Sequence, residues 1–321
     1  MKYAPLGSSD IALSKVIMGT WQTGKRMWVG IDDNESIAAL RAAFDQGVTS
    51  FDTAEVYGNG HAERIIAKAL GSQRKETVLL SKVFCNHLKR DQVFEACHRS
   101  LENLGTDVID LYQIHWPAGT FNTPLVPIEE TMSALVDLKQ QGKIRGIGVS
   151  NFSRAQLEEA LRFGPIDSVQ PPYSLFWRMH DRELIPFCRD KNIAVLAYSP
   201  LAQGILADKF TADHQFEEGD HRAQHRLFAQ PHWSRVQDAL AQLRPIAADL
   251  GISMAQLALA WITHGPNHFA IAGARRPDQI TNSAAAAAVT LDNGLWQQIA
   301  AIGDTVAVHL DDNPKQWAFA N

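Results

Sequence analysis

Apolar runs and amphipathic segments alternate along most of the chain. Eight short segments are rich in apolar and β-branched residues, and several of them are continuous apolar runs rather than alternating apolar and polar positions. Continuous runs are typical of parallel strands that are covered on both faces. The predicted strands are Lys15–Thr20, Thr49–Ala54, Thr77–Val83, Val108–His115, Ile144–Ser150, Asp167–Tyr173, Ile193–Pro200 and His268–Ala274.

The segments between these strands have the periodicity of amphipathic helices. The first begins with Asp33, a candidate N-cap, and closes with Gly47. The alanine-rich run Ser283–Val289 predicts a closely packed helix after the last strand, because alanine is the best helix former. The other predicted helices cover 91–105, 128–142 and 153–164.

Eight strands with intervening helices predict an α/β protein of the (β/α)8 barrel type, with residues 1–321 in one domain. A doubly wound parallel sheet is the alternative, and a GxGxxG motif after the first strand would favour it, but the sequence has none. We expect residues 1–15 to form a β-hairpin over the barrel floor. Residues 202–230 predict a long polar loop between the seventh and eighth strands. Loops of this length in compact domains are commonly functional or mobile.

Composition narrows the class of protein. The chain is 45% hydrophobic with a net charge of -5, so no basic excess indicates nucleic acid or an anionic membrane as a partner. Its three cysteines form no CxxC pair and therefore indicate neither a disulfide framework nor a zinc ribbon. The N-terminus lacks a signal-peptide pattern, and no apolar run approaches the roughly 20 residues that span a bilayer. We expect a cytoplasmic protein and, as the simplest case, a monomer.

The long loop contains His214, His221 and His225, which raise the possibility of a metal site. His221 and His225 have helical i, i+4 spacing, but no glutamate completes an HExxH pattern. We interpret the segment as a solvated loop and expect no metal.

Polar residues with complementary chemistry stand at the ends of three successive predicted strands. Asp52 ends the second strand and Tyr57 follows on a glycine-rich turn, Lys82 ends the third, and His115 ends the fourth. Successive positions are about one βα unit apart, so all four side chains can reach the same rim of a barrel, where barrel active sites lie.

These four residue types together suit carbonyl reduction. A phenol has a pKa of about 10, and a neighbouring ammonium lowers it by stabilising the phenolate. A carboxylate keeps the lysine charged and aimed, while the histidine donates a hydrogen bond to the carbonyl oxygen that receives the proton. Taken singly, Lys82 and His115 are also explained as an ion-pair partner and a structural histidine, and a metal-dependent barrel hydrolase using Asp52 and His115 is an alternative.

Long motifs make the chain resemble the aldo-keto reductases over essentially its whole length. The segments FDTAEVYGNG, LLSKV, DLYQIHWP, GKIRGIGVSNF, AYSPLAQG and GARRPDQI occur in that family's order. Within the family the chain is most similar to bacterial general-stress and inositol-operon reductases, and it also resembles the β-subunits of voltage-gated potassium channels. The second likeness implies an alternative function, an NADPH-binding regulatory or redox-sensing subunit with slow turnover.

The resemblance implies NADPH-dependent, reversible reduction of aldehydes and ketones, with a catalytic tetrad of Asp52, Tyr57, Lys82 and His115. Tyr57 would donate the proton, and Tyr198 would stack on the nicotinamide. The cofactor-binding residues implied are Gly19, Thr20, Trp21, Asp52, Ser150, Asn151, Gln170, Tyr198, Ser199, Pro200, Leu201, Gln203, Gly204, Gly273, Ala274, Arg275, Gln279 and Asn282.

Arg275 is the candidate ligand of the 2′-phosphate, since a guanidinium can pair with its oxygens. Arg276 is either a second contact or a solvated loop charge. Relatives commonly have Glu-Asn where this chain has Asn282-Ser283, so adenine would be held more loosely and NADH remains an alternative cofactor.

Aromatic residues near the strand ends predict a substrate wall for small apolar or aromatic aldehydes. Core packing is the alternative explanation for the tryptophans. The implied substrate-site residues are Trp21, Trp28, Tyr57, Phe84, His115 and Trp116.

Overall fold

The computed structural model describes residues 1–313 and 315–317. Within them, eight parallel strands close into a barrel in the order β10-β3-β4-β5-β6-β7-β8-β9, which confirms the predicted (β/α)8 fold. The predicted domain, 1–321, also includes residues 314 and 318–321, which lie outside this description. The barrel strands are β3 (Val16–Gly19), β4 (Ser50–Asp52), β5 (Val78–Val83), β6 (Ile109–Ile114), β7 (Ile144–Ser150), β8 (Ser168–Gln170), β9 (Ala194–Tyr198) and β10 (His268–Gly273).

An antiparallel hairpin, β1 (Tyr3–Pro5) and β2 (Ala12–Ser14), precedes the barrel as predicted. Its apolar side chains belong to the same buried cluster as side chains of the barrel strands, including Ile17, Leu111 and Phe269. The hairpin therefore closes the end of the barrel at which the strands begin, and leaves their carboxyl ends as the open mouth.

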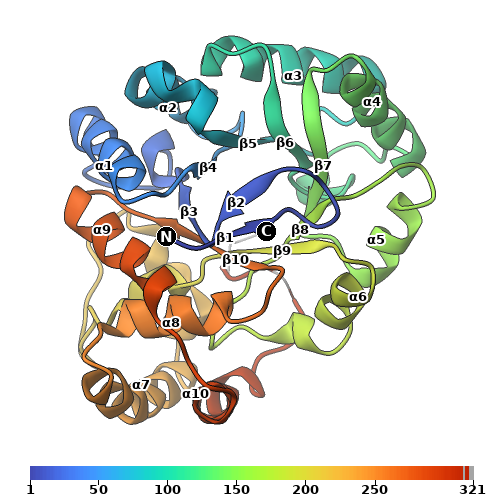
Figure 1. The fold of residues 1–321 in the computed structure, drawn as a ribbon. Helices are drawn as coiled ribbons and strands as arrows, with labels where there is room; N and C mark the ends of the chain where they lie inside the picture. The colour runs from blue at the N-terminus through green and yellow to red at the C-terminus, as the bar shows by residue number, and fades with distance from the viewer. Residues whose placement is uncertain (314, 318–321) are drawn as a thin grey trace.

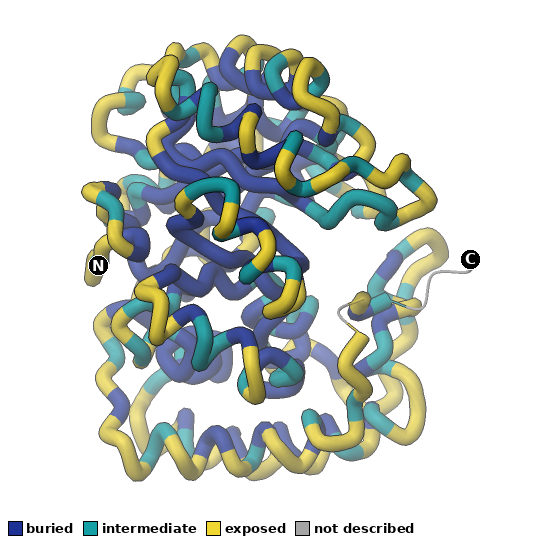
Figure 2. Tube along the Cα trace, turned by 90° about the vertical axis from the view of Figure 1, so that its right-hand side faces the viewer, coloured by how far each residue is buried: buried dark blue, intermediate teal, exposed yellow. Residues whose placement is uncertain are grey.

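Helices form an outer ring around the strands (Figure 1), and the strand segments between them are buried (Figure 2). The helices are α1 (Asp33–Asp45), α2 (His61–Leu70), α3 (Arg90–Leu104), α4 (Ile128–Gln140), α5 (Arg154–Ala160), α6 (Leu184–Asp190), α7 (His232–Asp249), α8 (Met254–Thr263), α9 (Pro277–Ala285) and α10 (Asn293–Ala307).

Two predicted helix boundaries were wrong. The N-cap of α1 is Asp32 rather than Asp33, and its carboxylate accepts hydrogen bonds from the amides of Asn34 and Glu35. Helix α5 ends at Ala160 rather than continuing to residue 164. The alanine-rich run lies partly in α9 and partly in the 3₁₀ helix Ala286–Ala288, so helical structure continues there as expected.

The segment 202–230 lies between β9 and α7 and is more ordered than a solvated loop. It contains the 3₁₀ helices Ala202–Ala207, His221–Gln224 and Arg226–Phe228. His221 and His225 are 7% and 1% exposed, so their assignment to a solvated loop was wrong, whereas His214 is exposed. In the described part of the chain no group of three His, Cys, Asp or Glu residues is arranged to hold a metal.

No single helix among residues 1–313 and 315–317 is long and apolar enough to cross a bilayer. Helices α7 and α8 are long and apolar enough only when they are counted together. The two helix axes are bent by 89° at the short break between them.

Candidate active site

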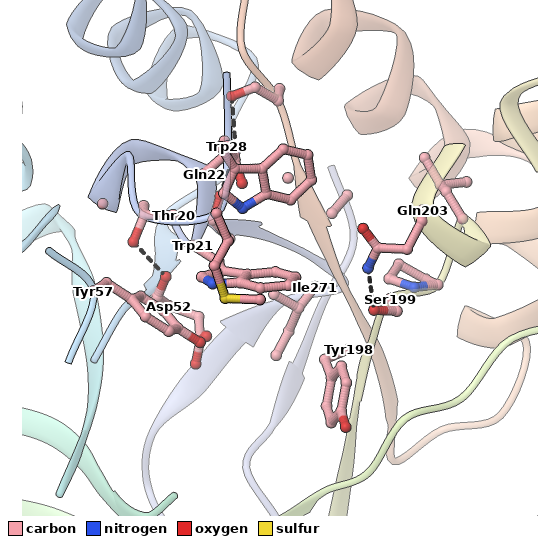
Figure 3. Close-up of a pocket in the computed structure, with 18 of the residues that line it drawn as sticks. Thr20, Trp21, Gln22, Trp28, Asp52, Tyr57, Tyr198, Ser199, Gln203 and Ile271 are labelled. Carbon is pink, nitrogen blue, oxygen red and sulfur yellow. Dashed lines mark hydrogen bonds between the residues drawn. The ribbon is translucent and has the colours of Figure 1, made fainter. Parts of the chain in front are cut away.

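A cavity of about 760 Å³ opens at the carboxyl ends of the barrel strands. That volume is within the ordinary range for sites that bind small molecules and cofactors. In the view of Figure 3, Tyr57 and Asp52 lie on one side of Trp21, while Tyr198, Ser199 and Gln203 lie on the other. The cavity therefore brings together residues of the predicted catalytic and cofactor sets from distant parts of the sequence.

A buried ion pair lies beneath this cavity. The Lys82 Nζ donates to Asp52 Oδ1 at 2.6 Å and to the Thr53 carbonyl at 2.8 Å, and Lys82 is fully buried. Burial lowers the pKa of Lys82, while the Asp52 carboxylate opposes that shift. The second Asp52 oxygen accepts from Gln170 Nε2 at 2.9 Å. This arrangement holds an ammonium in one place at low dielectric, as the sequence predicted.

Tyr57 is fixed by a close approach between two backbone turns. A Cβ added at Gly24 would lie 2.7 Å from the carbonyl carbon of Tyr57, and Gly58 has a φ of +63°. Glycine is required where chains approach this closely and where φ is positive. The turn before α1 therefore lies directly against the peptide that carries the tyrosine.

The ionisation of Tyr57 differs from the sequence-based expectation. Burial raises its pKa well above the ordinary value for a phenol, and the Asp52 charge raises it further. Burial and the Asp52 charge outweigh the opposing effect of the Lys82 ammonium, whose Nζ lies 5.4 Å from the centroid of the Tyr57 ring and is bonded to Asp52. At neutral pH the phenol is therefore protonated and can act as a proton donor.

His115 faces Tyr57 across the floor of the cavity. The two ring centroids are 5.6 Å apart, with an interplanar angle of 79°. Burial, with a smaller contribution from Lys82, lowers the pKa of His115 well below its ordinary value. The imidazole is therefore neutral at pH 7, and it retains one N–H with which to donate a hydrogen bond.

Four members of the predicted cofactor-binding set form a bonded group across β7, β8 and β9, namely Ser150, Asn151, Gln170 and Tyr198. Asn151 Nδ2 donates to the His115 carbonyl and to Ser150 Oγ, and Asn151 Oδ1 accepts from the Tyr198 hydroxyl at 2.8 Å. Gln170 lines the cavity, and its Oε1 has no partner among the described residues. An acceptor in that position fits an amide such as that of nicotinamide.

The opposite end of the cavity is basic and suits phosphate groups. Left-handed backbone at Ser199 and Gln203, with φ of 52° and 59°, turns the chain after β9 along the cavity wall. Gln279, which was predicted to contact the cofactor, lines the cavity and accepts from the Arg275 amide at 2.8 Å. The described residues that line this region include Pro200, Leu201, Gly204, Lys209, Arg222, Gly273, Ala274, Arg275 and Arg276.

Asn282 does not belong to the lining of this cavity. Its Oδ1 accepts from Ser253 Oγ at 3.1 Å, and its carbonyl accepts from Gln256 Nε2. Its side chain therefore joins α9 to the start of α8 rather than pointing at the cavity, contrary to its predicted contact with the adenine.

The aromatic residues predicted to form the substrate wall line the cavity, together with two others. Trp21 and Trp28 line the cavity with ring centroids 5.3 Å apart, and Phe84 and Trp116 line it as well. The sequence did not indicate two further members, Phe121 and Trp317. Trp317 packs edge-on against Trp21 at 5.3 Å, and Phe121 contacts Phe84 and Trp116.

Comparison with known proteins decides the family. A sequence profile described as "Aldo/keto reductase family" matches residues 15–304. The chain belongs to the aldo/keto reductase family.

Relatives of this aldo/keto reductase include several with assigned names. The chain is 38% identical over 292 residues to aldo-keto reductase YhdN of Bacillus subtilis, covering 87% of each chain. It is 35% identical over 316 residues to an NADH-specific methylglyoxal reductase of Escherichia coli, covering 91% of this chain and 95% of the relative.

Two solved structures share this aldo/keto reductase fold over nearly the whole chain. The glycerol dehydrogenase AKR11B4 of Gluconobacter oxydans has a TM-score of 0.86 and 31% identity, with 99% of each chain covered. An aldo-keto reductase of Klebsiella pneumoniae in complex with NADPH has a TM-score of 0.73 and 28% identity, again covering 99% of each chain. The comparisons support an oxidoreductase that binds a nicotinamide cofactor.

Glu55 has a structural part in this aldo/keto reductase that the sequence did not reveal. The residue lies between β4 and α2, and it is only 9% exposed. Its carboxylate accepts from the Phe84 amide and contacts His87 Nδ1, both at 2.9 Å, and it pairs with Arg99 at 3.0 Å. The partners come from the next βα loop and from α3, so Glu55 anchors the loop that carries Phe84.

His221 joins the long segment to the turn before α1. Its Nδ1 lies 2.5 Å from the Met27 carbonyl, and its ring is 4.5 Å from that of Trp28. On the other side, Arg275 lies 5.0 Å from the Trp28 ring and donates to the Val29 carbonyl. Two separate segments thus hold Trp28 at the edge of the cavity.

Proposed function

We propose that this aldo/keto reductase is a cytoplasmic, monomeric enzyme that reduces aldehydes and ketones to alcohols with NADPH. One observation carries the proposal. Tyr57 and His115 face each other at 5.6 Å in a cavity whose floor contains the buried Lys82–Asp52 pair. The open Gln170 Oε1 and the basic far end of the same cavity fit the two ends of a nicotinamide dinucleotide.

In the proposed reaction, a nicotinamide cofactor held in the cavity would supply the hydride that reaches the carbonyl carbon. The protonated Tyr57 hydroxyl donates its proton to the carbonyl oxygen, and neutral His115 donates a hydrogen bond that orients the same oxygen. Lys82 then stabilises the phenolate that Tyr57 becomes, while Asp52 holds the lysine in position. Tyr198, which lines the cavity, would pack against a bound nicotinamide, and in alcohol oxidation Tyr57 would act as the base.

The direct test is oxidation of NADPH by 4-nitrobenzaldehyde, followed as loss of absorbance at 340 nm with the purified protein. We expect enzyme-dependent turnover. Tight NADPH binding without any oxidation across a panel of aldehydes would contradict the reductase function and favour a cofactor-binding regulatory subunit.

Arg275 is proposed to select NADPH over NADH by binding the 2′-phosphate. A lost hydrogen bond to a charged group costs about 1.5–3 kcal/mol, or about ten- to a hundredfold in affinity. We therefore expect Arg275→Ala to weaken the binding of NADPH by that factor. The affinity for NADH should fall by less than about twofold. Titration of both cofactors by protein fluorescence measures the two dissociation constants.

Arg276→Ala is the matched control for this variant. The Arg276 guanidinium is exposed and is bonded to the Asp278 carboxylate at 3.1 Å, so we expect a smaller effect on NADPH. Equal losses of NADPH and NADH affinity in Arg275→Ala would refute the role in 2′-phosphate binding.

A further inference from the structure

The cavity is far more basic than the chain that contains it. Although the net charge is -5, only one carboxylate among the described residues lines the cavity, that of Asp52, and it is paired with buried Lys82. The cationic side chains that line the cavity are Arg26, Lys209, Arg222, Arg275, Arg276 and Lys315. A concave site lined by one sign of charge concentrates ligands of the opposite sign.

Four of these six cations lie at the end of the cavity proposed to bind the cofactor, and two of the four, Arg222 and Arg276, are paired with Asp220 and Asp278. Lys209 and Arg222 come from the segment after β9, and Arg275 and Arg276 follow β10, which is the end of the cavity proposed above to bind phosphates. Arg26 and Lys315 come from other parts of the chain, and the proposed cofactor site makes no use of them.

Arg26 and Lys315 both approach the substrate wall at Phe84. Arg26 lines the cavity and also a hollow that adjoins it, which it shares with Phe84 and Glu55. The Lys315 Nζ lies 5.2 Å from the centroid of the Phe121 ring, which is stacked on Phe84 at 6.0 Å. The Phe84 ring is 5.6 Å from that of His115. The stacked rings of Phe84 and Phe121 therefore lie between the proposed carbonyl position and Lys315, and Arg26 lines the hollow that Phe84 also lines.

Neither cation is neutralised by the protein. Within the described residues, no carboxylate lies within ion-pair distance of Arg26 or Lys315, although most basic residues nearby are paired. Lys25 pairs with Asp33 at 3.0 Å, and Glu55 in the adjoining hollow is bonded to Arg99 and His87. Both Arg26 and Lys315 are exposed at the mouth, so an entering anion can reach them.

We propose that the carbonyl substrate carries an anionic group, a carboxylate or a phosphate, at the end opposite its carbonyl, and that Arg26 and Lys315 bind this group. The inference rests on the proposed reductase function and names its substrate class. The aromatic side chains between the cations and His115 pack against the middle of the substrate, while the guanidinium and ammonium form charge-assisted hydrogen bonds to its anionic end.

Paired substrates of similar size test the proposal. We expect kcat/KM for 4-carboxybenzaldehyde to exceed that for 4-formylbenzamide by about five- to tenfold at low salt. The ratio of kcat/KM for glyceraldehyde 3-phosphate to that for glyceraldehyde tests a phosphate in the same way. The two substrate pairs therefore distinguish a carboxylate-binding site from a phosphate-binding site. Because exposed charges are screened by salt, the preference should shrink at about 0.5 M NaCl.

Variants that remove one or both charges test whether Arg26 and Lys315 cause the preference for anionic substrates. Arg26→Gln and Lys315→Gln should each lower the ratio of anionic to neutral substrate, and the double variant should bring it close to one. Lys75→Gln, which removes an exposed lysine outside the cavity, should keep the wild-type ratio. A wild-type ratio near one for both pairs, or an unchanged ratio in the double variant, would overturn the proposal.

Failure of the reductase function is recognised separately, as the absence of NADPH oxidation with all four aldehydes. In that case, quenching of tryptophan fluorescence by 4-carboxybenzaldehyde and by 4-formylbenzamide still compares their binding. Stronger binding of the carboxylate that the double variant abolishes would support the anion site, and equal binding would refute it.

Discussion

Replacement of Tyr57 by phenylalanine is expected to lower kcat/KM for carbonyl reduction by about a hundred- to ten-thousandfold, the usual contribution of a positioned general acid. The ring remains, so its contacts with His115 and with the Lys82 ammonium persist. Only the hydroxyl that donates the proton is lost. Steady-state NADPH oxidation measures the loss, and fluorescence titration should show NADPH affinity close to that of the wild type.

Tyr3→Phe provides a matched control for this prediction. It removes a hydroxyl that donates to the Gly47 carbonyl at 2.8 Å, on the hairpin at the closed end of the barrel. We expect its turnover to equal that of the wild type. A Tyr57→Phe enzyme with full activity would show that another group donates the proton.

Replacement of Lys82 by methionine is expected to reduce both stability and turnover. The substitution leaves the Asp52 carboxylate, which is 3% exposed, with Gln170 as its remaining side-chain donor. Removing one partner of a buried ion pair typically costs about 3–5 kcal/mol, because the other charge stays buried without compensation. Urea unfolding followed by circular dichroism measures the change in the free energy of unfolding.

The double variant Lys82→Met/Asp52→Asn separates the charge effect from packing. It removes both charges, so we expect it to regain much of the stability that Lys82→Met loses. It should not regain turnover, because no ammonium is present to stabilise the Tyr57 phenolate. If the single and double variants are equally unstable, the loss arises from packing around residue 82 and not from an unpaired carboxylate.

Much of the fold could be predicted because its signals are local. Each barrel strand is a short apolar run, and the observed boundaries lie within a few residues of the predicted ones. The segment 167–173 shows the limit of this approach, since β8 ends at Gln170, before Pro171 and Pro172. Proline has no backbone N–H to donate to a neighbouring strand, and this local rule could have shortened the prediction.

The convergence of Asp52, Lys82 and His115 could also be predicted, because parallel barrel strands bring their carboxyl ends to one rim. The direction in which the Tyr57 pKa is shifted could not be predicted. The sequence showed a lysine near the phenol, but the balance depends on burial and on the bond from Lys82 to Asp52, which are properties of the packed structure.

The sequence-based predictions failed mainly at contacts between segments that are distant in the sequence. His221 and His225 stand in a polar stretch, yet both are buried, and their rings pack against Trp317 near the end of the described chain. Glu55 meets Arg99 from α3, and Asn282 meets Ser253 across two helices. No local pattern predicts such pairs, because their partners are determined by how the helices and loops pack around the barrel.

The contact between Gly24 and the Tyr57–Gly58 peptide limits where the chain can change to accept new substrates. The turn that contains Gly24 leads directly into Arg26 and Trp28, so an insertion there would displace the backbone of the proposed proton donor along with the substrate wall. Phe121 and Lys315 line the same cavity but lie far from Gly24 in the sequence. Substitutions at these two positions would leave the Gly24–Tyr57 contact in place, which makes them suitable targets for redesigning specificity.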